Sequence, residues 1–276
     1  MLHDDDLRQA LREAGLGHLP LTAHGGVPVL QGVPHEALLD VWRTVRALVP
    51  TTGRWPVAVL PDASWYLVAD GAPEQAARLA DAVPSHGDAL SDWVDDLPWD
   101  ADLLVRYLER RFPAALGLGR RLVEEVGAPT TEPVRVDWLY RELLADPALR
   151  AQVEVRHLQG TQQWHRPSEL VALALLPGAH GWLAPAVLCF HSWQEPDRAV
   201  ALAAALRRWE DRYGAELVAH WGTVLQLVVA RPPSDPDVAY ALAAELKDVG
   251  GSLQHHRYEL ALALPGSDAW MLHDRP

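Results

Sequence analysis

Apolar residues recur at helical spacing in several stretches of the chain. After Pro34, a single apolar face is formed by Leu38, Trp42, Val45 and Val49, which predicts an amphipathic helix. The same spacing, with prolines as breaks, predicts further helices at residues 88–125, 137–149, 196–213 and 235–249.

Short apolar runs between these helices predict strands. Several runs are apolar on both faces, which is typical of central strands that helices cover. Gly222 and Thr223 are expected to form the turn of a hairpin. The predicted strands are residues 27–30, 55–60, 65–69, 170–176, 186–190, 216–220, 224–230 and 269–273.

The order of these elements predicts the fold class α+β. From residue 186 the chain reads strand, helix, strand, strand, helix, strand, which is the split β-α-β-β-α-β (ferredoxin-like) pattern. We therefore expect an N-terminal α/β part with a helical segment (residues 1–132) that packs on a C-terminal α+β domain (residues 133–276). Prolines and glycines make residues 113–135 the candidate linker.

Composition and charge narrow the possible functions. The net charge is −13, and nucleic-acid binding, which needs Lys and Arg to neutralise phosphates, is not expected. An acidic surface fits a basic protein partner better.

No run approaches the ~20 apolar residues of a membrane helix, and the acidic start is unlike a signal peptide, so we expect a cytoplasmic protein. The chain has no Ile, no Asn and one Lys, which is typical of a GC-rich, bacterial genome.

Single residues exclude several standard chemistries. Cys189 is the only cysteine, so an intrachain disulfide or a multi-cysteine zinc site is impossible. Lys247, on a predicted surface helix, is followed by Asp248 and cannot form a P-loop. The Gly-Leu-Gly run at 117–119 lacks the third glycine of a dinucleotide fingerprint. No cofactor is expected.

Five runs in the last third of the chain resemble a known family. They are Phe-His-Ser-Trp at 190–193, Trp-Glu-Asp-Arg-Tyr-Gly-Ala-Glu-Leu-Val at 209–218, Leu-Val-Val-Ala-Arg-Pro-Pro at 227–233, Ala-Ala-Glu at 243–245, and Trp270 with Asp274. Together they resemble the bacterial domain of unknown function 4253, most clearly over residues 184–274. The family usually ends in Trp-x-Trp-Trp-Asp, whereas this chain has Trp-Met-Leu-His-Asp. The resemblance implies no established activity and no catalytic residues.

Cys189 and His191 are the nearest match to a nucleophile and its base. On a strand, residues two apart point to the same face, where an imidazole could activate the thiol. The alternative is a buried structural cysteine.

Arg231 ends a predicted core strand directly before two prolines, and it could bind a carboxylate or phosphate bidentately. The alternative is an ion pair with Asp235 or Asp237. Three further residues of the family-like runs are candidate binding residues, namely Trp193, Trp270 and Asp274.

A metal site is a further hypothesis, with His255, His256 and His273 as candidate ligands beside Asp274. Polar residues of a loop or edge strand are the alternative, and no bound metal is expected. The family-like runs also carry the carboxylates of Glu210, Glu216 and Glu245, and Glu210 is spaced for a surface ion pair with Arg207.

Tryptophan is unusually frequent, with 12 residues against two phenylalanines. Core packing explains part of this excess, and exposed tryptophans mark protein interfaces. The leading hypothesis is a bacterial cytosolic protein that is a non-catalytic protein-binding module of an immunity or regulatory type. The alternative is an enzyme with a Cys/His or metal-assisted hydrolytic site in the C-terminal domain.

Overall fold

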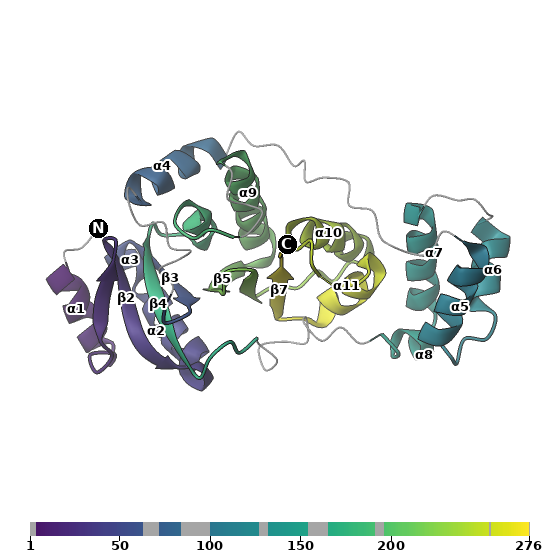
Figure 1. The fold of residues 1–276 in the computed structure, drawn as a ribbon, viewed down its shortest axis with the longest axis horizontal. Helices are drawn as coiled ribbons and strands as arrows, with labels where there is room; N and C mark the ends of the chain where they lie inside the picture. The colour runs from purple at the N-terminus through teal and green to yellow at the C-terminus, as the bar shows by residue number, and fades with distance from the viewer. Residues whose placement is uncertain are drawn as a thin grey trace.

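The computed structural model describes residues 4–62, 72–83, 100–126, 132–153, 165–190, 196–253 and 255–275. These residues form one mixed sheet with helices packed around it, and a group of helices at one end of the molecule (Figure 1). The predicted strand at 65–69 lies outside the described residues. The predicted class α+β is confirmed.

The N-terminal elements alternate between helix and strand. They are α1 (Asp4–Glu13), β1 (Leu21–His24), β2 (Val27–Pro34), the 3-10 helix η1 (His35–Ala37), α2 (Leu38–Ala47), α3 (Val49–Thr52) and β3 (Arg54–Val59). The predicted apolar face after Pro34 is confirmed, because Leu38, Trp42 and Val45 of α2 are buried. That face packs against β2 and β3.

The middle of the chain is helical. Its elements are α4 (Ala72–Ala82), α5 (Ala101–Arg111), α6 (Leu118–Val126), α7 (Glu132–Ala145) and α8 (Pro147–Arg150). The candidate linker at 113–135 is therefore wrong in large part, because α6 and the start of α7 occupy it. Apolar Leu118 and Leu122 of α6 are buried, and this burial orders a stretch that its prolines and glycines marked as a linker.

The C-terminal elements are β4 (Leu170–Pro177), the 3-10 helix η5 (Gly181–Ala186), α9 (Pro196–Tyr213), β5 (Ala215–His220), β6 (Val224–Val229), α10 (Pro236–Val249), α11 (Arg257–Ala263), the 3-10 helix η7 (Leu264–Gly266) and β7 (Ala269–His273). The predicted helix at 196–213 is confirmed. So is the start of α10, where the Asp235 side chain accepts hydrogen bonds from the backbone amides of Asp237 and Val238, directly after Pro236.

The seven strands form one sheet in the order β1-β2-β4-β3-β5-β6-β7. All neighbours are antiparallel except β3 and β5, which are parallel with Ala58 opposite Ala219. Strand β4 lies between β2 and β3, and seven of its eight residues are buried, as expected of a central strand. The sheet thus joins strands from both predicted parts, and the boundary at residues 132 and 133 stays a prediction.

The ferredoxin-like arrangement is not confirmed. The predicted strand at 186–190 is wrong, because the chain forms the 3-10 helix η5 and then an irregular segment there. Most of this segment is buried, which accounts for its apolar residues. A short apolar run alone does not distinguish a strand from another buried segment. Strand β7 pairs with β6, so β5, β6 and β7 follow one another in the sheet. The hairpin turn is confirmed, with Gly222 at a φ of 82°.

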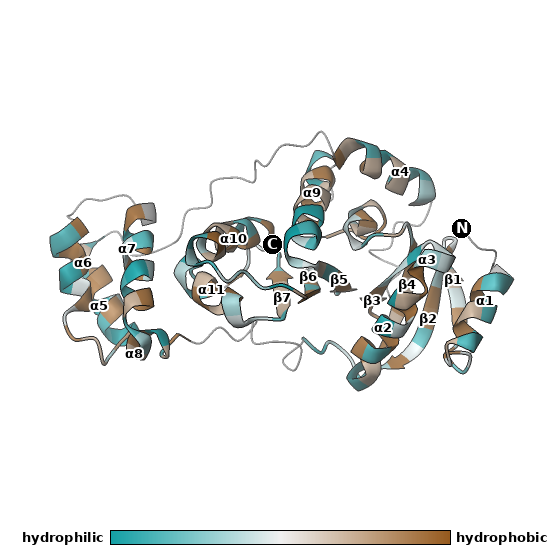
Figure 2. Ribbon diagram, turned by 180° about the vertical axis from the view of Figure 1, so that it is seen from behind, coloured by the Kyte–Doolittle hydropathy of each residue, from teal (hydrophilic) through white to brown (hydrophobic). Residues whose placement is uncertain are grey.

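Hydrophilic and hydrophobic residues are mixed along the helices (Figure 2). Helices α5 to α8, called the helical segment below, lie beyond α10 and α11 at the end of the molecule (Figure 1). Helix α7 packs against α11. Among the described residues, no helix is long and apolar enough to cross a membrane.

Gly119 sets the close approach of α5 and α6. A Cβ at this position would lie 2.7 Å from the Cα of Val105, which is a backbone atom that cannot move aside alone. We expect Gly119→Ala to lower the free energy of unfolding by about 2 kcal/mol through overpacking. Urea denaturation checks this, with Gly266→Ala as the control, because a Cβ at Gly266 meets nothing within 4 Å. Equal stabilities of the two variants would contradict the prediction.

Candidate functional site

Two carboxylates of the family-like runs lie together near the surface. Glu210 is in the last turn of α9, and Glu216 is in β5. Gly214, with a φ of 59°, turns the chain from α9 directly into β5, which places both side chains on the same side of this corner. We call these two glutamates, with His180 and Arg46, the Glu210 cluster.

Each carboxylate of the cluster has one basic partner. His180 Nδ1 lies 3.1 Å from Glu210 Oε1. The Arg46 guanidinium donates to Glu216 Oε1 through Nη2 at 2.7 Å and through Nε at 3.2 Å. Arg207 was expected to pair with Glu210 and instead lies 3.9 Å from Asp211. Because Arg46 belongs to α2 and His180 precedes η5, the cluster joins three distant stretches of the chain.

Two indole rings pack against the basic residues of the cluster. The Arg46 guanidinium carbon lies 4.2 Å from the centroid of the Trp55 ring, a cation–π distance. His180 stacks on Trp182 with centroids 5.5 Å apart. Trp55 Nε1 donates to the carbonyl of Leu217 at 2.9 Å, which fixes its ring against β5. Arg46 and His180 therefore each pack on a buried indole ring, and we call Trp55 and Trp182 the aromatic base.

The pKa of Glu210 is raised. Burial is the main cause, and the neighbouring charge of Glu216 adds to it, while His180 and Arg46 act in the opposite direction. Glu210 keeps 20% of its side chain exposed and Glu216 keeps 26%. Burial thus outweighs the two basic neighbours in setting the pKa of Glu210, while part of its side chain stays exposed.

The predicted cysteine–histidine pair gains no support from the thiol. Cys189 is half-buried and lies outside any strand, and burial raises the pKa of its thiol, which disfavours the reactive thiolate. His191 and Trp193 lie outside the described residues, so the pairing stays a prediction.

Arg231 has a structural contact. Its Nη2 donates to the carbonyl of Asp211 at 3.0 Å, near the C-terminal end of α9. The expected ion pair with Asp235 or Asp237 is wrong, because Asp235 caps α10 and Asp237 binds Arg141 at 2.6 Å. The Arg231 side chain is exposed, and its binding role stays a prediction.

Trp270 and Asp274 are both buried. Trp270 is 1% exposed and lies edge-on to Trp209 and Tyr213, at centroid distances of 6.2 and 5.5 Å. Every described tryptophan is buried or half-buried, which confirms the core interpretation for these residues. Their burial gives no support to a contact surface made of Trp270 and Asp274.

The candidate metal ligands have other roles. His256 is the N-cap of α11, which the sequence did not predict, and His255 Nδ1 lies 3.6 Å from Glu259. His273 ends β7. Within the part of the chain that the structure describes, no group of three or more His, Cys, Asp or Glu side chains could hold a metal ion.

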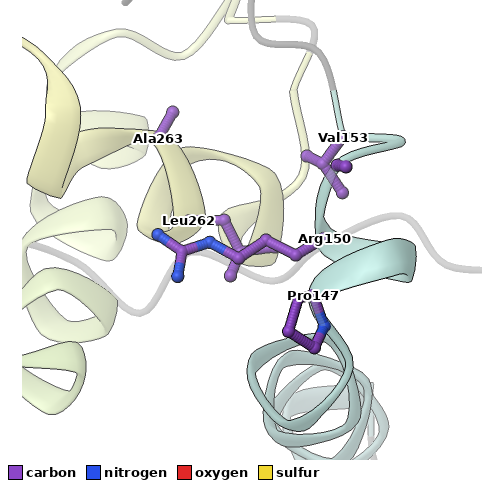
Figure 3. A pocket seen from close by; sticks show the side chains of 6 residues that line it. Pro147, Arg150, Val153, Leu262 and Ala263 are labelled. Atoms are coloured by element: carbon purple, nitrogen blue, oxygen red, sulfur yellow. The ribbon is translucent and has the colours of Figure 1, made fainter.

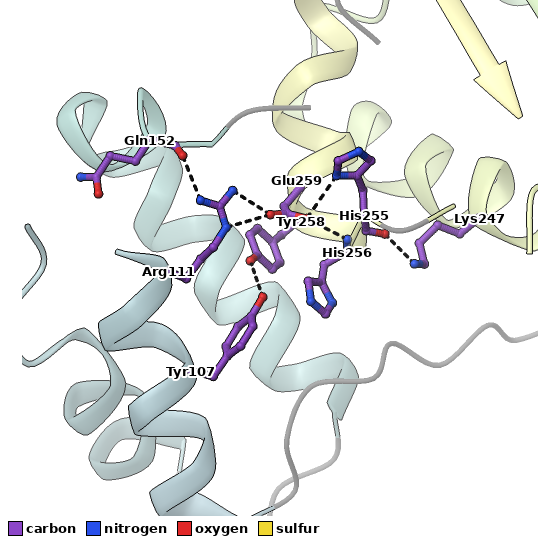
Figure 4. Close-up of polar contacts among 8 residues, drawn as sticks. All are labelled: Tyr107, Arg111, Gln152, Lys247, His255, His256, Tyr258 and Glu259. Atoms are coloured by element: carbon purple, nitrogen blue, oxygen red, sulfur yellow. Dashed lines mark hydrogen bonds and ion pairs between the residues drawn. The ribbon is translucent and has the colours of Figure 1, made fainter. Parts of the chain in front are cut away.

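Sequence reasoning missed a buried network around Glu259 (Figure 4). Arg111 donates to Glu259 Oε1 through Nε and Nη2, at 3.1 and 2.9 Å, and through Nη1 to the carbonyl of Gln152 at 3.0 Å. The His256 amide donates to Glu259 Oε2 at 3.0 Å. This network attaches the helical segment to α11. Arg111 and Glu259 are 148 residues apart, so no local spacing could reveal their contact.

Electrostatics show how strongly Glu259 is held. Burial by itself would raise its pKa, but hydrogen bonds from His255, Arg111 and the His256 amide outweigh burial and lower the pKa to about 2.

The predicted surface position of Lys247 is wrong. It is 5% exposed rather than on the surface, because its Nζ donates to the His255 carbonyl at 2.6 Å.

The molecule is thus an α+β protein with a mixed seven-stranded sheet and a partly exposed glutamate–histidine–arginine cluster beside it. Residues 172–274 match the model of the family described as Domain of unknown function (DUF4253), which confirms the resemblance. Glu210 and Glu216 lie inside the matched region, whereas Arg46 lies outside it. No curated protein and no solved structure matches the chain significantly.

Proposed function

We propose that this protein is a non-catalytic protein-binding module of an immunity or regulatory type, and that the Glu210 cluster contacts a basic partner. The observation that carries this proposal is the partly exposed side chain of Glu210, whose pKa is raised chiefly by burial, so that its ionised form is less stable than in water. A positively charged side chain of a partner would stabilise that ionised form. The net charge of −13 would favour approach of the same kind of partner.

The aromatic base strengthens this proposal. Arg46 and His180 rest on Trp55 and Trp182, so the polar groups of the cluster are ordered before a partner arrives. Ordering in advance reduces the entropy lost on binding. The raised pKa of the Cys189 thiol argues against the nucleophile that the enzyme alternative requires.

Affinity capture from a lysate of the native host tests the proposal. The tagged full chain is expected to retain one stoichiometric protein rich in Lys and Arg, identified by mass spectrometry, with retention that falls as salt rises. Glu210→Gln is expected to weaken the affinity for that protein about tenfold, because one charge pair is lost. Glu109→Gln, at an exposed position of α5, is the matched control and should bind normally.

Two outcomes would overturn the proposal. One is a captured partner whose affinity for the Glu210→Gln variant equals that for the unchanged chain. The other is a partner whose binding does not respond to salt, since contact between opposite charges near a surface is screened by ions. Circular dichroism of the variant shows whether any loss of binding reflects misfolding.

A further inference from the structure

A cleft of about 340 Å³ lies between α8 and α11 (Figure 3). Its walls come from two regions that are far apart in sequence, the end of the helical segment and the matched family region. The lining residues are Pro147, Arg150, Ala151, Val153, Leu262 and Ala263. The volume is at the lower end of the range for small-molecule sites.

Arg150 is the charged residue of this lining. Its side chain extends from α8 toward α11 and passes Leu262, as Figure 3 shows. The Arg150 guanidinium makes no hydrogen bond or ion pair with the part of the chain that the structure describes. An arginine of the lining that has no counter-ion among these described residues is available to a ligand.

The neighbouring charges leave Arg150 uncompensated. The Asp146 carboxylate, one turn earlier, accepts hydrogen bonds from the amides of Ala148 and Leu149 as the cap of α8. Glu259 is engaged by Arg111. Among the described residues, these two acids are therefore engaged in other contacts, and the cleft offers positive charge beside apolar walls.

We propose that this cleft binds a small carboxylate with a short apolar chain. The Arg150 guanidinium would hold the carboxylate bidentately, in the geometry that suits this pair. The chain would lie against Val153, Leu262 and Ala263, which supply the apolar part of the lining. Because the walls come from α8 and α11, the ligand would bridge the helical segment and the matched region.

Isothermal titration calorimetry of the full chain with hexanoate tests this site. Binding is expected, and Arg150→Gln should weaken it at least tenfold, about the loss of one charge-assisted contact. Ala151→Phe, at an exposed position of the lining, should block binding by filling the cleft. Arg110→Gln, at an exposed position of α5, is the matched control and should bind as the unchanged chain does.

A titration with inorganic phosphate separates the two parts of the proposal. Hexanoate binding with weak or no phosphate binding supports a site that reads both the charge and the apolar chain. Phosphate binding without hexanoate binding would overturn the assignment to an apolar carboxylate. Absence of hexanoate binding, or equal hexanoate affinity of Arg150→Gln and the unchanged chain, would overturn the site itself. These outcomes are independent of the Glu210 cluster.

Discussion

Replacing Glu259 with alanine is expected to lower the free energy of unfolding by about 3 kcal/mol. Glu259 is 5% exposed, and it accepts two hydrogen bonds from Arg111 and one from the His256 amide. Its removal leaves the Arg111 guanidinium without its counter-ion and takes one partner from the N-terminus of α11. Because Arg111 keeps 27% of its side chain exposed, water recovers part of the loss and the effect falls at the lower end for buried pairs.

Equilibrium urea denaturation measures this loss. Glu109→Ala is the matched control, because Glu109 is an exposed glutamate on α5 and its substitution should change stability by less than about 0.5 kcal/mol. A Glu259→Ala variant that is as stable as this control would show that the network contributes nothing to attachment of the helical segment.

The same network predicts a dependence of stability on pH. The folded-state pKa of Glu259 is about 2, below the ordinary 4.5, so the unfolded chain takes up the proton more readily. The stabilisation is therefore complete above about pH 4.5, is lost as the pH falls toward about 2, and amounts to about 3 kcal/mol. The advantage of the unchanged chain over Glu259→Gln should shrink between about pH 5 and about pH 3. An advantage that stays constant over this range would contradict the lowered pKa.

The sequence predicted those elements whose pattern is local. Helix α9 and strand β7 have the predicted bounds, because helical periodicity and a short apolar run each identify an element when turn residues flank it. The predicted strand at 186–190 failed because burial made an irregular segment equally apolar. Helix α11 was missed because its first turn is stabilised by Glu259, whose own partner Arg111 lies in the helical segment.

In the candidate site, too, the sequence indicated single residues but not the contacts between distant ones. The sequence singled out Glu210 and Glu216 as carboxylates of the family-like runs, but not their contacts with His180 and Arg46. Those contacts depend on where β3 and β5 pair in the sheet, and this pairing brings together residues 170 positions apart. Tertiary pairing of this kind leaves no periodic signal in a single sequence.

Trp55→Ala is expected to cause the largest loss of stability, about 4 kcal/mol. The Trp55 ring is 1% exposed, packs edge-on against Trp42 at 6.3 Å, and donates a hydrogen bond to the carbonyl of Leu217. Alanine would leave a cavity between α2 and the sheet and an unsatisfied carbonyl in β5. It would also remove the ring on which Arg46 rests.

The Arg46 contact distinguishes this prediction from general damage to the core. Trp209→Ala removes an equally buried indole that packs against Trp270, and is the matched control for chemical denaturation. Both variants should be destabilised by several kcal/mol. Only Trp55→Ala should also reduce the cost of Arg46→Gln in a double-mutant cycle, because the cation–π contact is then already absent and only the Glu216 ion pair remains to be lost. A full Arg46→Gln loss in the Trp55→Ala background would mean that the Glu216 ion pair alone holds Arg46, and that the aromatic base does not order the cluster.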